Sequence, residues 1–317
     1  MFVLLSFLGL TSAFRYPSFD IWAVDHGKTY PGQTEYDYRN SVYDANVKKI
    51  RAHNRGNNTW AMTVNKFADL TGPEFKRLFV SGGFRKTKRN LRYDLPQGLP
   101  ASVNWTDVGV VSPVKDQGQC GSCWAFSTTG SAESAWALAN NTLVSVSEQQ
   151  LVDCSVKQGN QGCNGGLMDY AFQYIIDNKG LTSEAAYPYT ATGPNTCVAS
   201  GKPRVLTISS FSDVPVDSEP ALLAAIALQP VSIAIEADQS VFQFYKSGVM
   251  NQACGTNLDH GVLAVGYGSL GGNDYYIVKN SWGLDWGMRG YILLGRGAKF
   301  NPKGQCGIQM AASYPVV

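Results

Sequence analysis

The spacing of apolar residues changes along the chain. Residues 123–139 and 166–178 place apolar side chains at helical spacing, which predicts two largely buried helices. Short runs rich in β-branched and aromatic residues follow in the C-terminal third, separated by glycine-containing turns, at 231–235, 261–268, 275–278 and 291–294. This order predicts an α+β protein in which a helical domain precedes a β-barrel-like domain, with a boundary near Phe211.

A third periodic segment lies nearer the N-terminus, at residues 34–54. Six of its residues are separated by 4, 4, 3, 4 and 4 positions, so they lie on one face of a helix. They are Glu35, Arg39, Tyr43, Asn46, Ile50 and Asn54. Thr34 is the predicted N-cap, and Gly56 is the predicted end of the helix. The spacing alone is equally compatible with an ordinary amphipathic helix.

The first 13 residues, MFVLLSFLGLTSA, form a short apolar run that ends in small residues, as signal peptides do. We therefore predict a secretory signal peptide at 1–13. No stretch reaches the roughly 18 to 20 apolar residues of a spanning helix, so no membrane span is expected. Residues 81–98 are rich in glycine and basic residues and lack apolar periodicity, which predicts an exposed linker and cleavage region.

Charge is unevenly distributed over the 317 residues, although the net charge is only +2. Residues 14–98 carry 15 Lys and Arg against 8 Asp and Glu, a charge of +7, and the rest of the chain carries 11 against 16, a charge of −5. Opposite charges predict attraction between the two parts, weakening as carboxylates are protonated at acid pH. Five basic residues cluster at 85–92, where a solvated basic linker explains them equally well.

Seven cysteines in a secreted chain leave one unpaired after any complete set of disulfides. Cys123 is the candidate for the unpaired thiol because it begins the helix predicted at 123–139. The positive end of a helix dipole favours the thiolate, which is the nucleophilic form of cysteine. Spacing alone leaves 15 possible pairings of the other six cysteines.

A nucleophilic cysteine needs a base, and the chain has only three histidines. His26 and His53 precede the expected cleavage region, which leaves His260 as the partner for Cys123. Asn280 follows an apolar strand-like run, and its amide oxygen is suited to accept the second ring proton of the imidazole.

Several local sequences, taken in order, resemble one family. The segment QGQCGSCWAF contains Cys123, LDHGVLAVGYG contains His260 and KNSWGLDWG contains Asn280. The motif C-G-S-C-W with histidine and asparagine far downstream is typical of papain-like cysteine proteases, and here the two residues lie 137 and 157 positions after the cysteine. The chain resembles this family, in its cathepsin L-like subfamily, over nearly its whole length. The resemblance implies a papain-like two-domain fold with a helical left domain, a β-barrel-like right domain and an N-terminal helical propeptide.

The resemblance also implies roles for matching residues. Cys123, His260 and Asn280 would act as nucleophile, base and orienting residue, and Gln117 would donate to the oxyanion, a contribution of roughly 3 kcal/mol in comparable sites. Trp282 would shield the bond between Asn280 and His260 from water. The implied substrate-binding residues are Gly165, Gly166, Leu167, Met168, Ala234, Leu258, Asp259, Gly261, Trp282 and Ala311. The implied disulfides join Cys120 to Cys163, Cys154 to Cys197 and Cys254 to Cys306. No metal or cofactor is implied.

The side chains of the implied S2 pocket are apolar or small. Because Ala311 contributes no carboxylate to the pocket, we expect the enzyme to prefer substrates with Leu or Phe at P2 over those with Arg. No histidine-rich insertion lies between Cys154 and Cys197 to occlude the cleft, which favours endopeptidase action.

The helix predicted at 34–54 and the later segment VNKFADL resemble the two propeptide motifs of cathepsin L-like proteases. Tyr43 stands where phenylalanine is commoner, and Thr63 stands where the second motif usually has glycine. The implied organisation is a signal peptide (1–13), an inhibitory propeptide (14–98), a helical domain (99–210) and a β-barrel-like domain (211–317). In this family the propeptide helix packs on the enzyme and the next segment runs backward through the cleft, so we predict a zymogen that matures at acid pH.

The expected partners are polypeptide substrates, the chain's own propeptide and cystatin-type inhibitors, without nucleic acid, and the expected state is a monomer. The expected destination is a lysosome-like vacuole or the extracellular space, by way of the secretory pathway. Sequons at Asn57, Asn104 and Asn140 allow glycosylation.

Three alternative functions are disfavoured by the sequence. A non-catalytic binding or storage relative is disfavoured because such proteins usually lose the nucleophile or its base. A transglutaminase-like acyl transferase is disfavoured by the propeptide motifs and Gln117, and an assay that separates cleavage from cross-linking would decide. Zinc binding by Cys120 and Cys123 is disfavoured because two thiols need further ligands.

Overall fold

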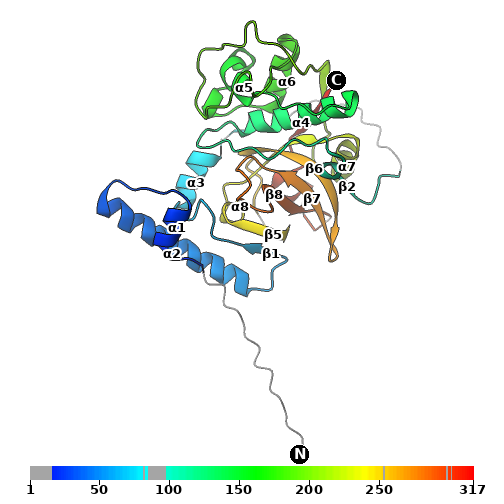
Figure 1. The fold of residues 1–317 in the computed structure, drawn as a ribbon. Helices are drawn as coiled ribbons and strands as arrows, with labels where there is room; N and C mark the ends of the chain where they lie inside the picture. Colours follow the sequence, from blue (N-terminus) through cyan, green and yellow to red (C-terminus); the bar gives the residue numbers. More distant parts are fainter. Residues whose placement is uncertain (1–15, 81–82, 85–97, 253, 298, 301) are drawn as a thin grey trace, which may run out of the picture.

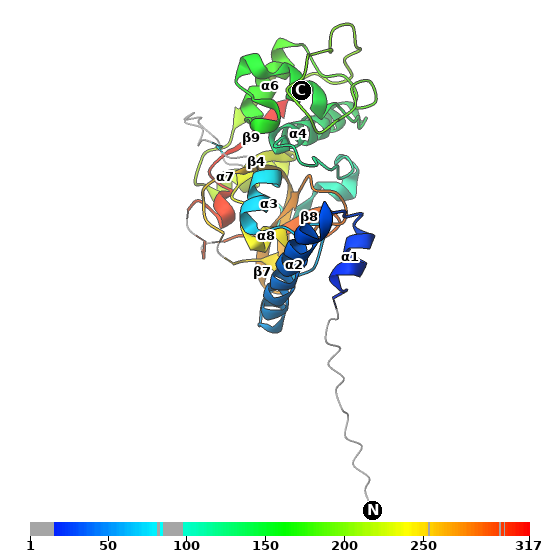
Figure 2. The same cartoon turned by 90° about the vertical axis from the view of Figure 1, so that its left-hand side faces the viewer.

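The computed structural model describes residues 16–80, 83–84, 98–252, 254–297, 299–300 and 302–317. The predicted signal peptide and most of the predicted linker lie outside the described residues. One group of helices covers the upper end of a central sheet, and the N-terminal helices lie along one side of the molecule, from mid-height downward (Figures 1 and 2). The upper helices are α4 (Cys123–Asn140), α5 (Glu148–Cys154) and α6 (Met168–Asp177). The N-terminal helices are α1 (Phe19–Asp25), α2 (Gly32–Arg55) and α3 (Gly72–Phe79).

The sheet has nine strands among the described residues, in the order β1-β5-β8-β7-β6-β4-β9-β3, with β2 paired to β6. β5 and β8 are parallel, and the other neighbours are antiparallel. The four predicted strand segments are confirmed as β4, β6, β7 and β8. The strands are β1 (Trp60–Met62), β2 (Val103–Asn104), β3 (Ser210–Asp213), β4 (Val231–Ile235), β5 (Tyr245–Met250), β6 (His260–Leu270), β7 (Asn273–Lys279), β8 (Tyr291–Gly295) and β9 (Ala312–Val316).

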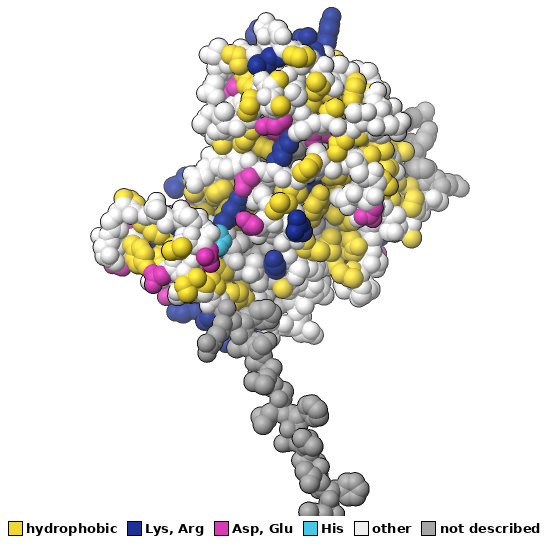
Figure 3. Space-filling model, in the orientation of Figure 1, with side chains coloured by type: hydrophobic (Ala, Val, Ile, Leu, Met, Phe, Trp, Pro, Cys, Tyr) yellow, Lys and Arg dark blue, Asp and Glu magenta, His cyan; other side chains and the backbone are white. Residues whose placement is uncertain are grey.

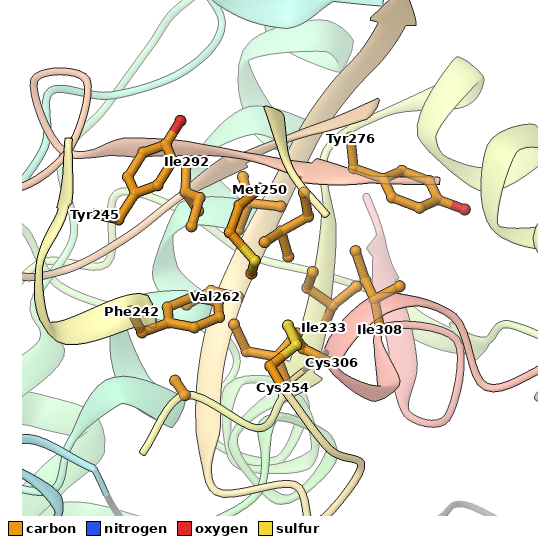
Figure 4. Close-up of a cluster of buried hydrophobic side chains, with 14 of the residues drawn as sticks. Ile233, Phe242, Tyr245, Met250, Cys254, Val262, Tyr276, Ile292, Cys306 and Ile308 are labelled. Carbon is orange, nitrogen blue, oxygen red and sulfur yellow. A yellow bond between two sulfur atoms is a disulfide. The ribbon is translucent and has the colours of Figure 1, made fainter. Parts of the chain in front are cut away.

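Strand β4 shows why its run VSIAI has no polar alternation. All five residues are buried, because the strand is covered on both faces. Ile233 and Ile235 enter the core of the sheet region, while Ala234 enters the core formed with the upper helices. Figure 4 shows Ile233 beside Val262, Met250 and the Cys254–Cys306 disulfide in the first of these cores. The two cores therefore meet at β4.

The N-terminal region has a small core of its own and also adds to the core of the sheet region. Its own core consists of Phe19, Trp22, Ala23, Tyr43, Val47 and Ala68. Strand β1 pairs with β5, and Trp60 and Phe75 belong to the same buried cluster as the strands of the sheet. Polar side chains on the helix face predicted at 34–54 connect α2 to the rest of the N-terminal region. Arg39 pairs with Glu74 at 2.9 Å, and the Asn46 side chain donates to the backbone carbonyls of Ala68 and Leu70 at 2.9 and 3.0 Å.

Two predicted helix ends are wrong. Gly32 adopts a φ of +81°, which glycine tolerates, so the chain enters α2 before Thr34, and that residue lies in the first turn instead of capping it. Helix α6 begins at Met168 instead of Gly166. Gly166 packs closely on Trp124 of α4, since a Cβ there would lie 2.7 Å from the ring. Leu167, the residue before the helix, is extended, with φ −122° and ψ 143°. The Asn160 side chain accepts from the Leu167 amide at 2.8 Å and fixes that conformation.

The remaining elements are short. They are α7 (Glu219–Leu228), α8 (Ser240–Gln243) and four 3₁₀ turns at Trp105–Val108, Val156–Gln158, Gly162–Asn164 and Gln305–Gly307. Three disulfides join Cys120 to Cys163, Cys154 to Cys197 and Cys254 to Cys306, the pairs that the resemblance implies. Within the described ranges, no helix has both the length and the apolar character required to cross a bilayer.

Candidate active site

The thiol of Cys123 lies where α4 meets β6. Cys123 is the first residue of this 18-residue helix, is fully buried and forms no disulfide. The backbone N–H of Gly261 donates to its Sγ at 3.3 Å. Gly261 directly follows His260, so the fold brings the thiol next to the candidate base across 137 residues of sequence. The helix N-terminus and the Gly261 amide both favour negative charge on sulfur.

The imidazole of His260 is held at the start of β6. Asn280, directly after β7, accepts from His260 Nε2 through its Oδ1 at 2.8 Å. The same oxygen accepts from the backbone N–H of Ser281 at 2.8 Å, which fixes the orientation of the amide. His260 Nδ1 forms no hydrogen bond within the described part of the chain. The ring therefore has one nitrogen fixed by Asn280, and its other nitrogen remains for proton transfer.

Trp282 covers this pair. Its ring stacks on His260 with centroids 4.6 Å apart and is itself fully buried. Phe67 and Phe75 of the N-terminal region press their edges against Trp282, at centroid distances of 5.6 and 5.2 Å. Burial lowers the pKa of His260 to about 4, and the hydrogen bond to Asn280 only partly opposes this. The covered imidazole is therefore neutral at neutral pH.

Gln117 is buried at the start of the loop that leads to Cys123, and both ends of its carboxamide are hydrogen-bonded. Its Oε1 accepts from Ser281 Oγ at 2.7 Å, and its Nε2 donates to the carbonyls of Cys120 and Phe79 at 3.0 and 3.3 Å. Phe79 belongs to α3, so a carbonyl of the N-terminal region takes one N–H of the amide that is expected to serve the oxyanion.

The side chain of Phe84 lies among the residues expected to form the S2 pocket. It packs against the apolar cluster that contains Ala234 and Leu258, and its ring edge is so close to Gly261 that a Cβ there would be 3.2 Å from it. A remaining cavity of about 20 Å³ is lined by Phe84, Leu167, Met168, Asp169, Ala311, Ala312 and Ser313. Gly165 and Gly166 line a neighbouring groove together with Gly83. The rest of the segment predicted to cross the cleft, 81–82 and 85–97, lies outside the described residues.

The pocket differs from the expectation in one respect. Asp169 contributes a carboxylate to the far end of the cavity, where its Oδ1 accepts from Ser313 Oγ at 2.6 Å, so the lining is not wholly apolar. The position of Asp169 directly after Met168, which is expected in the pocket, is the sequence signal that could have identified it as a lining residue. Asp259 does not line this cavity. Its carboxylate accepts from the Ala237 amide at 2.7 Å, and burial raises the pKa of Asp259 to about 7.

A cluster of buried charged residues lies behind the site, and the sequence does not predict it. Lys115 pairs with Glu148 at 2.8 Å, and Lys279, next to Asn280, donates to Ser112 at 3.0 Å. Ser112 donates in turn to Glu133, so the cluster joins α4, α5 and β7 behind the cleft. Burial lowers the pKa of Lys279 to about 8. These partners are too far apart in sequence for any local pattern to reveal them.

Cys120, the first cysteine of the pair considered for zinc binding, is not a free thiol. Cys120 is bonded to Cys163, so it has no thiolate to offer a metal. The disulfide instead anchors the loop that leads into Cys123.

The site belongs to a region that matches known proteins. Residues 99–316 match the family described as papain family cysteine protease, and residues 19–75 match the cathepsin propeptide inhibitor domain (I29). The chain is 47% identical over 308 residues to the probable cysteine protease RD21B of Arabidopsis thaliana, covering 94% of this chain and 66% of that protein. It thus spans about two thirds of that relative's length.

Two further relatives are covered over more of their own length. The germination-specific cysteine protease 1 of Arabidopsis thaliana is 45% identical over 311 residues, which is 93% of this chain and 82% of that protein. The solved structure of a recombinant stem bromelain precursor is 38% identical, with a TM-score of 0.88, and covers 94% of this chain and 97% of the other. The match thus extends over the N-terminal region as well as the part that holds Cys123.

Proposed function

Because the chain belongs to the papain family of cysteine proteases and carries that family's propeptide inhibitor domain, we propose that Cys123 is its nucleophile, His260 its acid–base partner and Asn280 the residue that orients the imidazole. The observation that carries this assignment is one junction. The Gly261 amide contacts Cys123 Sγ at 3.3 Å, while the adjacent His260 is bonded to Asn280 at 2.8 Å.

The proposed reaction is hydrolysis of a peptide bond. The Cys123 thiolate attacks the scissile carbonyl carbon and forms a C–S bond, and the carbonyl π electrons move to oxygen, giving an oxyanion held by the Cys123 N–H and the Gln117 amide. The carbonyl re-forms when the amine leaves, which gives the thioester. The His260 imidazolium gives its proton to the leaving amine as the C–N bond breaks. A water molecule then loses a proton to His260 and attacks the acyl carbon, and the thiolate leaves.

We assign inhibition of the zymogen to three contacts of the N-terminal region. Phe67 and Phe75 bury Trp282, the Phe79 carbonyl occupies the Gln117 amide, and Phe84 fills the apolar pocket. In this account the propeptide blocks substrate at the oxyanion site and the S2 pocket together.

Among the described residues, two ion pairs cross from the propeptide to the enzyme. Lys66 pairs with Asp116, and Lys76 pairs with Asp238 at 2.6 Å, so both cations belong to the propeptide. Figure 3 shows basic and acidic side chains interspersed on the face where the N-terminal helices meet the rest of the molecule. Attraction between these opposite charges helps to hold the propeptide on the enzyme.

The buried imidazole of His260 links release of the propeptide to pH. His260, whose pKa burial lowers to about 4, gains a proton on uncovering, so it favours release as the pH falls from about 6.5 toward 4. We therefore assign acid-dependent release to protonation of His260 as it is uncovered.

We further propose that residues 1–13 are removed as a signal peptide, that 14–98 is removed on maturation, and that 99–210 and 211–317 form the two domains of a monomeric enzyme. The three disulfides suit the secretory pathway and a vacuole or the extracellular space beyond it. Cystatin-type inhibitors would occupy the same cleft as substrates. Asn57 and Asn140 are exposed and are the better glycosylation candidates, since Asn104 is only partly exposed.

The test is to hold the purified chain with a thiol reductant at pH 4 to 5 and to follow its mass and its hydrolysis of fluorogenic peptides. We expect loss of the region before Leu99, followed by cleavage of peptides with Leu or Phe at P2. A folded, processed chain without any cleavage would contradict the assignment and favour a binding protein. Cross-linking in place of hydrolysis would indicate an acyl transferase.

Replacing Gln117 by alanine removes a side-chain donor to the oxyanion. We expect kcat of the matured enzyme to fall by about 10²-fold, with KM changed by less than about threefold, since the donor acts mainly in the transition state. Gln119→Ala is the matched control, because Gln119 is exposed on the same loop. Equal kcat for Gln117→Ala and the control would remove Gln117 from the mechanism.

Replacing Ala311 by glutamate places a carboxylate in the pocket that Phe84 fills. We expect the ratio of kcat/KM for P2 Arg over P2 Leu to rise by about tenfold or more, equivalent to about 1.4 kcal/mol of charge pairing. Ala311→Gln, of equal size and without charge, should leave the ratio near the wild-type value. An unchanged ratio in the glutamate variant would place the P2 side chain elsewhere.

A further inference from the structure

The hydroxyl of Tyr189 joins the two ends of the loop that leads into the site. It lies 2.7 Å from the backbone carbonyl of Gln117 and 2.5 Å from Ser122 Oγ. Gln117 begins this loop with the oxyanion side chain, and Ser122 ends it as the residue before Cys123. Tyr189 itself comes from the segment between α6 and β3, outside the active-site motifs.

The direction of these hydrogen bonds follows from their chemistry. The Gln117 carbonyl can only accept, so Tyr189 donates its proton there. The Ser122 hydroxyl then donates to the oxygen of Tyr189. One phenol oxygen thus links the main chain of Gln117 to the residue that precedes the Cys123 amide.

The ring of Tyr189 is held in place independently of its hydroxyl. It meets Phe126 of α4 edge to face, with centroids 4.9 Å apart. Its backbone N–H donates to Glu184 at 2.8 Å. A phenylalanine at this position would keep the ring packing, so the contribution of the hydroxyl can be measured by itself.

The rest of the loop is restrained in its middle and at its start. Cys120 is bonded to Cys163, and the Gly121 N–H donates to the Cys163 carbonyl at 2.9 Å. The Gln117 N–H donates to the Ser281 carbonyl at 2.8 Å. In the described structure, the Tyr189 hydroxyl is hydrogen-bonded both to the Gln117 backbone and to Ser122, and so links the two ends of the loop directly.

We propose that Tyr189 is a positioning residue that sets the distance between the two oxyanion donors, the Gln117 side chain and the Cys123 N–H. The proposal rests on the proposed function, because it assumes that these two groups stabilise the transition state. Oxyanion donors act only within a narrow range of distance, and a displacement of about 1 Å can cost about 10²-fold in rate.

The experiment compares matured wild type with Tyr189→Phe, with concentrations set by titration of reactive thiol. We expect kcat for peptide substrates to fall by about 5- to 20-fold with KM changed less than about twofold, as for loss of a transition-state contact. The rate of Cys123 alkylation by iodoacetamide should stay within about twofold of wild type, because that displacement forms no oxyanion. A role in stability alone would not separate the two reactions in this way.

Tyr187→Phe is the matched control. Tyr187 lies in the same segment, is buried and donates to Asp153 at 2.8 Å, away from the cleft. Its loss should lower the melting temperature and leave kcat per titrated site unchanged. If Tyr189→Phe does not fold, Ser122→Ala removes the second contact of the phenol and should lower kcat by about two- to fivefold in the same pattern.

Two results would overturn the proposal: kcat of Tyr189→Phe equal to that of wild type, or alkylation and turnover falling in parallel. Failure of the proposed function is distinguishable, because then the wild-type protein itself would hydrolyse no peptide.

Discussion

Cys123→Ala should abolish peptide hydrolysis, with a loss in kcat of at least about 10⁴-fold, as nucleophile removal does in other proteases. The change deletes one sulfur atom, and the Gly261 amide loses its contact at 3.3 Å, so the fold should persist. The chain should remain full length at pH 4 to 5, because it cannot process itself. Hydrolysis of a fluorogenic peptide and intact mass measure the two effects.

Ser131→Ala is the control for this change. Ser131 is buried two turns further along the same helix, and its loss should leave activity within about twofold of wild type, as expected for a small change away from the reacting atoms. Retention of more than a few per cent of wild-type turnover by Cys123→Ala would show that another group performs the attack.

Phe75→Ala should make the full-length chain active at pH 7, where the wild-type zymogen is silent. Phe75 is fully buried against Phe67, Phe79 and Trp282, at centroid distances of 5.2, 6.0 and 5.2 Å. Truncation of a buried phenylalanine costs about 3–5 kcal/mol, so the uncovered fraction should rise by at least about 10²-fold. The measurement is hydrolysis at pH 7 before any processing, with mass recorded at the same times.

Two controls separate uncovering from a general loss of structure. Ile21→Ala changes a residue of α1 that is 57% exposed, and it should leave the zymogen silent. The matured enzyme obtained from Phe75→Ala should equal wild type, because Phe75 is absent from it. A folded Phe75→Ala zymogen that stays silent at pH 7 would refute the role given to the contact with Trp282.

Much of the fold could be predicted from the sequence because its signals are local. The helix at Cys123 and the strands β4, β6, β7 and β8 follow from apolar spacing that survives in the folded chain. The errors lie where tertiary contact overrides a local rule. Gly166 packs under Trp124 and delays α6, and Gly32 turns the chain before the predicted cap.

The candidate site could be predicted as far as its motifs extend. Cys123, His260, Asn280 and Gln117 lie in recognisable local sequences, and the structure brings them to one junction. The Asp169 contact with Ser313, the Tyr189 bridge and the Lys115–Glu148 pair each depend on long-range folding. Such contacts leave no periodic trace in the sequence.

The most direct test of the central claim is the location and timing of thiol alkylation. Iodoacetamide would be added at neutral pH to the zymogen and to acid-matured protein, and the modified residue would be identified by peptide mass spectrometry. We predict rapid modification of Cys123 alone, after the residues before Leu99 are lost, with loss of activity in proportion to label. Rapid labelling of Cys123 in the intact zymogen, or full activity after its alkylation, would contradict the account.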